Sequence, residues 1–194
     1  LLYVGFENFE KMLSLYDLDI NCVPASALGV DETSLINLVS IYNSFASLGT
    51  YYYPRIIKKI TDSNGTVLYI NNTKAKTILD KPYVYLLNQM LRAPFDDNLS
   101  SYTTPTLLNY QTSCLYAAKT GTDSYNSYTI GYNPNYTIGV WTGTDNNDFF
   151  RYKNISKKVF QETANKITNK NLWYNPPSYI KEKNINGSSY WIFK

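Results

Sequence analysis

The chain has 194 residues, of which 44% are hydrophobic and 17% are charged, and its formal net charge is +3. This length and composition predict one globular domain with a hydrophobic core and exclude an intrinsically disordered chain. The 18 lysines and arginines are scattered rather than gathered in a basic stripe, which argues against nucleic acid as a partner.

The residue types that are missing or rare limit the catalytic and metal-binding chemistry that this chain can carry out. The sequence has no histidine, which excludes Ser-His-Asp and Cys-His catalysis and histidine-ligated zinc within this chain. The two cysteines, Cys22 and Cys114, lack the spacing of metal ligands, and a disulfide between them is left open. We therefore expect no metal and no cofactor. No apolar run is long enough to span a bilayer, and there is no signal peptide.

The first part of the chain predicts two helices. Residues 7–18 have the apolar spacing of an amphipathic helix, and residues 19–32 are predicted to be a loop. A second helix follows, with Thr33 as its N-cap and Gly49 as its C-terminal stop. Because the chain begins at Leu1, without a methionine, we expect it to be a fragment of a longer polypeptide.

The next part predicts a hairpin and a third helix. Residues 51–70 have the pattern of two strands around Ser63-Asn64-Gly65, since Asn-Gly favours a tight turn. Asp80 is the predicted cap of the following helix, with Pro82 in its first turn and Pro94 at its end.

The last part predicts a sheet and a fourth helix. Residues 95–112 are polar and irregular, and three antiparallel strands follow at 114–122, 126–132 and 136–143. Trp141 is predicted to be a core residue of the last strand. A helix is expected over 154–168, and the tail from Trp173, with Pro176-Pro177, is predicted to be a linker or the start of another module.

The segment Lys119-Thr120-Gly121-Thr122 combines groups that can bind an anion and an oxyanion. Alternate side chains of a strand share a face, so Thr120 and Thr122 present two hydroxyls on one side. Gly121 lets a ligand approach the backbone, the Thr122 amide can donate to a developing oxyanion, and Lys119 adds positive charge. This pattern favours acyl transfer with a serine nucleophile. The alternative is an exposed edge strand with a gatekeeper lysine and ordinary threonines.

The segment from Ala117 to Thr122 resembles the third motif of the penicillin-binding proteins, which are D,D-transpeptidases. Two further stretches resemble the same family and occur in the family's order. They are Ala27-Leu28-Gly29 through Pro54, including Thr33-Ser34-Leu35, Tyr42, Phe45-Ala46 and Gly49, and then Gly131-Tyr132-Asn133-Pro134 with Val140-Trp141-Thr142-Gly143. The last stretch, with the helix and proline-containing tail after it, is most similar to the class A, bifunctional branch.

The resemblance implies an α+β fold, the C-terminal part of a β-lactamase/transpeptidase-like domain in which helices pack on an antiparallel sheet. Residues 1–172 would be the C-terminal half of the transpeptidase domain, and residues 173–194 a linker or tail. Lys119 would bind the stem-peptide carboxylate and support proton transfer. Thr120 and Thr122 would hydrogen-bond that carboxylate or its β-lactam equivalent beside Gly121, and the Thr122 amide would supply half of the oxyanion hole.

The resemblance also implies a function for the parent protein. It would crosslink peptidoglycan through a serine acyl-enzyme, with stem peptides and β-lactams as ligands and the N-terminal half of the same domain as partner. It would be anchored at the extracytoplasmic face of the bacterial cytoplasmic membrane, with a glycosyltransferase domain upstream as an open possibility. The alternatives are a non-catalytic penicillin-binding-like sensor or scaffold, and a D,D-carboxypeptidase or β-lactamase.

Two of the family's motifs are missing from their expected places. Ser-x-x-Lys occurs at Ser178-Tyr179-Ile180-Lys181, and Ser-x-Asn at Ser124-Tyr125-Asn126, both after the third motif, whereas the family has both before it. We interpret both as coincidences and expect the chain to begin immediately after the family's second motif. The isolated chain is therefore predicted to be inactive.

Overall fold

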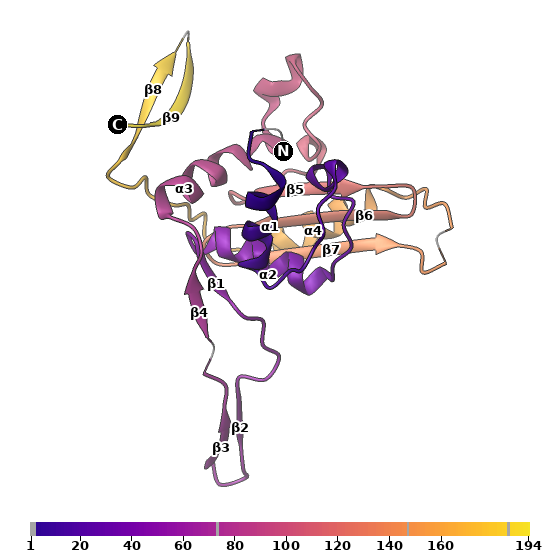
Figure 1. Cartoon of the computed structure of the whole chain (residues 1–194), viewed down its shortest axis with the longest axis vertical. Helices are drawn as coiled ribbons and strands as arrows, with labels where there is room; N and C mark the ends of the chain where they lie inside the picture. The colour runs from indigo at the N-terminus through magenta and orange to yellow at the C-terminus, as the bar shows by residue number, and fades with distance from the viewer. Residues whose placement is uncertain (1–2, 73, 147, 186) are drawn as a thin grey trace.

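A computed structural model describes residues 3–72, 74–146, 148–185 and 187–194. Its centre is a three-stranded antiparallel sheet, ordered β5-β6-β7 and formed by β5 (Ala117–Thr122), β6 (Asn126–Tyr132) and β7 (Thr137–Gly143) (Figure 1). The register pairs Thr120 with Thr129 and Thr129 with Val140. The three predicted strands are confirmed, and the first begins at Ala117 rather than at residue 114.

Two helices, α2 (Leu35–Ala46) and α4 (Ile155–Ile167), cover opposite faces of this sheet. Strand glycines permit the close packing, since a Cβ at Gly139 would lie 2.3 Å from Val39 of α2 and a Cβ at Gly131 would lie 2.3 Å from Phe160 of α4. Gly131 pairs with Ile138, the neighbour of Gly139, so the two glycines face opposite sides of the sheet.

A buried polar cluster joins α4 to β6. The Ser156 hydroxyl lies 2.8 Å from Ser127 Oγ and 3.0 Å from Thr129 Oγ1, and Ser127 Oγ donates to the Lys153 carbonyl at 2.6 Å. All three hydroxyl residues of the cluster are fully buried. Each of these buried hydroxyls has a hydrogen-bond partner, so the cluster leaves none of the three unpaired. The cluster therefore helps to fix the position of α4 on the sheet.

The third predicted helix is confirmed as α3 (Lys81–Met90). Asp80 is its N-cap, although its side chain makes no capping hydrogen bond. The buried Asn88 joins α3 to the rest of the fold, because its side chain donates to the Phe45 carbonyl at 3.1 Å and accepts from the Tyr132 hydroxyl at 2.7 Å. Burial raises the pKa of Tyr132, so this hydroxyl remains a donor at neutral pH.

The ends of α2 differ slightly from the prediction. The N-cap is Ser34 rather than Thr33, because Ser34 Oγ accepts from the Asn37 amide at 3.3 Å. Gly49 ends the helical region with a positive φ of 99°. A side chain at Gly49 would lie 1.9 Å from the Leu79 carbonyl oxygen, so glycine is required there for conformation and for space.

Residues 50–72 and 74–77 belong to an arm that projects away from the sheet (Figure 1). The predicted hairpin around Ser63-Asn64-Gly65 is confirmed as β2 (Lys59–Thr61) paired with β3 (Val67–Ile70). Residues 51–52 do not belong to that hairpin, because β1 (Thr50–Tyr52) pairs with β4 (Ala75–Thr77) at the base of the arm. Both strands of the inner hairpin are solvent-exposed.

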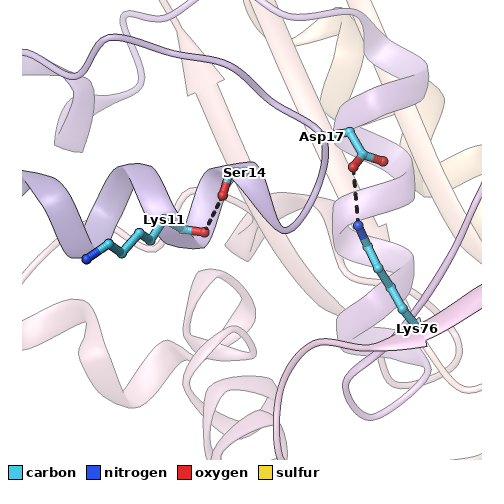
Figure 2. Close-up of polar contacts among 4 residues, drawn as sticks. All are labelled: Lys11, Ser14, Asp17 and Lys76. Carbon is cyan, nitrogen blue, oxygen red and sulfur yellow. Dashed lines mark hydrogen bonds and ion pairs between the residues drawn. The ribbon is translucent and has the colours of Figure 1, made fainter.

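The base of the arm is attached to the turn after α1 (Phe6–Ser14). Lys76 Nζ lies 3.3 Å from Asp17 Oδ1, and the Ser14 hydroxyl donates to the Lys11 carbonyl at 2.8 Å (Figure 2). Asp17 has a positive φ of 58°, which is incompatible with a continuing helix and explains why α1 ends before residue 18. Lys76 also lies 5.3 Å from the ring centroid of Tyr53.

Short 3-10 turns occupy two segments that were predicted to be irregular. They are η1 (Pro24–Leu28) in the first loop, and η2 (Ala93–Phe95), η3 (Asp97–Ser101) and η4 (Leu108–Tyr110) between α3 and β5.

Cys22 and Cys114 are free thiols in the structure. Cys114 is only partly buried, and it packs against the core formed by Tyr116, Phe160 and Ala164.

The C-terminal segment contains a hairpin that the sequence did not predict, formed by β8 (Ile180–Ile185) and β9 (Ser188–Phe193). It packs on α3, with the Trp191 ring centroid 5.4 Å from the Tyr85 ring centroid and the Phe193 ring centroid 5.2 Å from that of Tyr83.

The division of the chain into a domain at 1–172 and a linker or tail at 173–194 stays a prediction. Among the described residues, no helix is long and apolar enough to cross a bilayer.

Candidate active site

The predicted motif forms the end of β5, which is an edge strand of the central sheet. Lys119, Gly121 and Thr122 are exposed, and Thr120 is half-buried. The segment between α3 and β5 rises beside this edge (Figure 1). The described part of the chain therefore leaves the motif accessible to a ligand from the side.

The direction of the backbone amides follows from one contact at the edge. The Ala118 amide donates to the Leu91 carbonyl at 2.8 Å, so it points away from β6 and toward the outer edge of the sheet. In an antiparallel ladder the amides of alternate residues point to the same side. The amides of Thr120 and Thr122 therefore also point outward, which is the direction that an oxyanion donor needs.

The side chains of the motif divide between the two faces of the sheet. Thr120 pairs with Thr129, whose hydroxyl contacts Ser156 of α4, so Thr120 and Thr122 project from the α4 face. Lys119, one residue away, projects from the opposite face. This arrangement agrees with the prediction that the two threonines share one face, and it puts the Lys119 side chain on the other face.

Lys119 itself bends over the outer edge of β5. Its Nζ donates to the Thr120 carbonyl oxygen at 2.6 Å. The ammonium and the outward Thr122 amide therefore both lie along the outer edge of β5, whereas the side chains of Thr120 and Thr122 leave the strand on the α4 face. An anionic ligand would contact all of them only if it lay along this edge, beside the strand.

A residue outside the predicted motif also contacts it. Thr120 Oγ1 donates to Thr106 Oγ1 at 3.0 Å. Sequence reasoning missed Thr106, because it lies in a polar segment rich in serine and threonine with no periodic pattern to distinguish one hydroxyl from the next.

The turn that follows the motif is ordered by Asp123. Its carboxylate accepts from the amides of Tyr125 and Asn126, both at 2.7 Å, and Lys153 Nζ donates to its carbonyl at 2.6 Å. Partial burial opposes ionisation of the carboxyl, but these donors and the Asn126 side chain outweigh it and lower the pKa of Asp123. The turn therefore fixes the C-terminal end of β5, next to Thr122.

The apparent Ser-x-Asn motif belongs to this turn. Asn126 uses both ends of its side-chain amide, donating to Asp123 Oδ2 at 3.1 Å and accepting from the Trp141 indole N–H at 2.8 Å. The Ser124 carbonyl accepts from the Phe150 amide at 3.0 Å. These contacts give both residues a structural role in the loop after β5 and support the interpretation of the Ser-x-Asn match as a coincidence. The prediction of Trp141 as a core residue is wrong, because its side chain is 38% exposed.

The apparent Ser-x-x-Lys motif lies on the C-terminal hairpin. Ser178 is in the turn before β8, and Lys181 is an exposed residue of that strand. A nucleophile and a base three residues apart share a face only on a helix, and this segment is not helical. The geometry therefore supports the interpretation of this motif as a coincidence.

A hollow of about 870 Å³ lies elsewhere, between the end of α3, the η2–η3 segment and β9. Phe95 and Trp191 line it, and so does Arg92, whose guanidinium lies 5.4 Å from the ring centroid of Trp173. The lining includes no residue of the motif Lys119–Thr122. We place the candidate site at the edge of β5 because the charge and the outward amides are there. The described residues hold no cluster of three or more metal-ligating side chains.

Solved structures identify the fold. Penicillin-binding protein 1A of Haemophilus influenzae superposes with a TM-score of 0.81 at 18% identity, over 99% of this chain and 37% of that one. Penicillin-binding protein 3 of Mycobacterium tuberculosis, solved in complex with ampicillin, gives a TM-score of 0.69 at 18% identity, over 84% of this chain and 45% of that one. The predicted α+β fold, that of a β-lactamase/transpeptidase-like domain, is confirmed.

Sequence comparison gives the family. Residues 15–173 match the family described as the penicillin binding protein transpeptidase domain. Penicillin-binding protein 2D of Bacillus subtilis is 33% identical over 168 residues, which cover 83% of this chain and 24% of that protein. Penicillin-binding protein 2a of Streptococcus pneumoniae is 28% identical over 93% of this chain and 25% of that protein.

The chain therefore belongs to the penicillin-binding protein transpeptidase family, as its motifs predicted. It spans about a quarter of the length of these two relatives.

Proposed function

We propose that this chain forms the carboxylate-binding and oxyanion-binding side of the active site of a peptidoglycan D,D-transpeptidase, a longer protein called the parent protein below. The observation that supports this most strongly is the outer edge of β5. There the outward amide of Thr122 and the ammonium of Lys119, which donates to the Thr120 carbonyl, lie along one edge in a chain of this family.

Each group has a distinct role in the proposal. The C-terminal carboxylate of the donor stem peptide, or the equivalent carboxylate of a β-lactam, contacts the hydroxyls of Thr120 and Thr122 and the ammonium of Lys119. The carbonyl oxygen of the scissile bond points toward the Thr122 amide, which supplies half of the oxyanion hole. Gly121 lets the substrate backbone approach the strand.

The proposed reaction proceeds through a serine acyl-enzyme. A serine outside these 194 residues attacks the carbonyl carbon of the D-Ala-D-Ala bond, and its proton passes through a base to the nitrogen of the leaving D-alanine. The oxyanion intermediate collapses to an ester. An amine of a neighbouring stem then attacks the ester, its proton returns to the serine oxygen, and the crosslink is formed. Lys119 supports proton transfer beside this site.

The setting of the parent protein belongs to the same proposal. The N-terminal half of the domain, with its Ser-x-x-Lys and Ser-x-Asn motifs, packs against the edge of β5, and residues 173–194 are a linker or tail. The parent is a membrane-anchored protein of the class A type that acts at the extracytoplasmic face, where its substrate lies. Relatives named penicillin-binding protein 1A and 2D support this assignment.

Covalent labelling tests the proposal. The purified parent protein should be labelled by a fluorescent penicillin at one serine outside these residues, as mapped by mass spectrometry of tryptic peptides. Parent protein that is folded but never acylated would contradict the proposal and favour a non-catalytic sensor or scaffold, particularly if the upstream sequence lacks Ser-x-x-Lys. Steady turnover of penicillin, in place of a long-lived adduct, would favour a D,D-carboxypeptidase or β-lactamase.

A further inference from the structure

Thr106 makes a direct contact with the candidate site, although it lies in none of the family motifs. The hydroxyl of Thr120 donates to the hydroxyl of Thr106 at 3.0 Å. The two residues are separated by the end of the irregular segment and the start of β5. The contact therefore joins the edge strand to the segment that rises beside it.

The backbone around Thr106 is held in place. Its neighbours Pro105 and Leu107 are both buried, and Leu107 is 0% exposed. The Leu107 amide donates to the Pro94 carbonyl at 2.8 Å, and the Gln111 side chain donates to the Phe95 carbonyl at 2.7 Å. Thr106 itself is exposed. Because these contacts hold the backbone on either side of it, its hydroxyl is presented toward Thr120 from a fixed position.

The contact has a chemical consequence for binding an anion. A hydroxyl donates one hydrogen bond and accepts up to two, whereas a carboxylate only accepts. Thr120 must therefore turn its proton from Thr106 toward the carboxylate when that ligand binds. The Thr106 hydroxyl can then reverse its direction and donate to Thr120, which makes a chain of two hydrogen bonds that polarise each other toward the anion.

We propose that Thr106 is a positioning residue for the substrate carboxylate and acts through the Thr120 hydroxyl. This inference rests on the proposed function, because it assumes that Thr120 binds that carboxylate. Thr106 does not touch the reacting carbonyl. Its loss should weaken recognition of the carboxylate and leave the chemistry of a ligand without that charge unchanged.

The test compares variants of the parent protein in the rate of acylation by penicillin G. Thr106→Val should lower the second-order acylation rate constant by about fivefold, the worth of one hydrogen bond between two neutral groups. Thr106→Ser, which keeps the hydroxyl, should stay close to the wild type. Thr104→Val is the matched control, because Thr104 is an exposed threonine of the same segment and should have no effect.

Two further measurements separate positioning from a general structural effect. The methyl ester of penicillin G, which lacks the carboxylate charge, should react equally fast with the wild type and with Thr106→Val. In a Thr120→Val background, Thr106→Val should lower the rate no further, since the two residues act as one unit. Thermal melting checks that the variants fold, and Thr106→Ala replaces Thr106→Val if the latter does not.

The outcomes separate this inference from the proposed function. An unchanged rate in Thr106→Val, or an equal loss with the ester or in the Thr120→Val background, would overturn the role of Thr106 while the wild type is still acylated. A wild-type parent protein that is not acylated at all would overturn the proposed function and this inference together.

Discussion

The Ala118 amide donates to the Leu91 carbonyl at 2.8 Å, which joins the end of α3 to the outer edge of β5. This contact occupies the edge immediately before Lys119. A ligand strand could therefore pair with β5 only from Lys119 onward, and the accessible part of the edge coincides with the motif.

The first prediction concerns Gly121, where a side chain fits the fold but not the proposed ligand. A Cβ at this position would meet only Tyr128 Cβ, at 3.8 Å, which is ordinary van der Waals contact. Gly121→Ala should therefore change the free energy of unfolding by less than about 0.5 kcal/mol. The methyl group would nevertheless restrict the approach of a ligand to the strand, so we expect acylation of the parent protein by penicillin to slow. Denaturant melts and acylation kinetics measure the two effects. A Gly121→Ala variant acylated at the wild-type rate would contradict the proposal that Gly121 leaves space for the ligand beside the strand.

The second prediction concerns Gly131, where the fold leaves no space. A Cβ there would lie 2.3 Å from Phe160 Cζ, and Phe160 is fully buried with its ring edge-on to Tyr116 at 5.5 Å. Gly131→Ala should destabilise the fold by about 1–3 kcal/mol, the usual cost of overpacking. Adding Phe160→Leu should recover part of this loss, because the clashing ring is then removed. Equal stability of Gly131→Ala and the wild type in denaturant melts would show that α4 does not pack as described.

The sequence predicted the central sheet and the helices on its faces because their signals are local. The predicted cap of α2, Thr33, lies one residue before the observed cap, Ser34, and the hairpin turn at Asn64-Gly65 is set by the residues of the turn itself. The motif Lys119–Thr122 was found in the same way, from alternation along one strand. Boundaries moved by a few residues where conformation, such as the positive φ of Asp17, decided the end of an element.

Two of the missed features depend on contacts between distant residues. The pairing of β1 with β4 spans the whole arm, and no local pattern marks it. Thr106 was missed because only the folded chain brings it to Thr120. The C-terminal hairpin differs, because Asn186-Gly187 stands between its two strands in the sequence and is the same local turn signal as Asn64-Gly65. Only the packing of this hairpin on α3, where Trp191 and Phe193 contact Tyr85 and Tyr83, depends on distant residues.

The third prediction concerns the charge of Lys119. The side chain is exposed and donates to the Thr120 carbonyl, so its removal should leave the fold intact. Lys119→Ala in the parent protein should lower the acylation rate constant with penicillin by about 100-fold, because a charge-assisted contact to the carboxylate is lost. Lys158→Ala is the control, since Lys158 is an exposed lysine of α4. An acylation rate constant within twofold of the wild type for Lys119→Ala would show that Lys119 does not bind the carboxylate.

The fourth prediction concerns the isolated chain. It contains the edge of β5 but neither a helical Ser-x-x-Lys nor an upstream Ser-x-Asn, so penicillin should form no stable adduct with it. Intact-mass spectrometry after incubation with excess penicillin checks this, with the parent protein as the positive control. An adduct mapped to Ser124 or Ser178 would show that one of the two apparent motifs is functional.

The fifth prediction concerns how Asp123 makes the stability of the fold depend on pH. Partial burial opposes its ionisation, but hydrogen bonds from the Asn126 side chain and from the Tyr125 and Asn126 amides, with the charge of Lys153, lower its pKa in the folded state. A carboxyl whose pKa is lower in the folded than in the unfolded chain stabilises the fold above the unfolded pKa of about 3.9, and this stabilisation is lost as the pH falls through the folded pKa.

Asp123→Asn keeps the shape of the side chain and removes its charge. At pH 7 the wild type should be the more stable by less than about 1 kcal/mol, because the carboxylate is near the surface and screened by solvent. The difference should begin to shrink below about pH 4, where the carboxyl of the unfolded wild type becomes protonated, and should shrink further as the pH falls through the lower pKa of the folded state. Urea melts of both proteins between pH 3 and pH 7 measure this, with Asp145→Asn as a control at an exposed site. A gap that stays constant down to the lowest pH would mean that Asp123 orders the turn beside Thr122 through its shape and not through its charge.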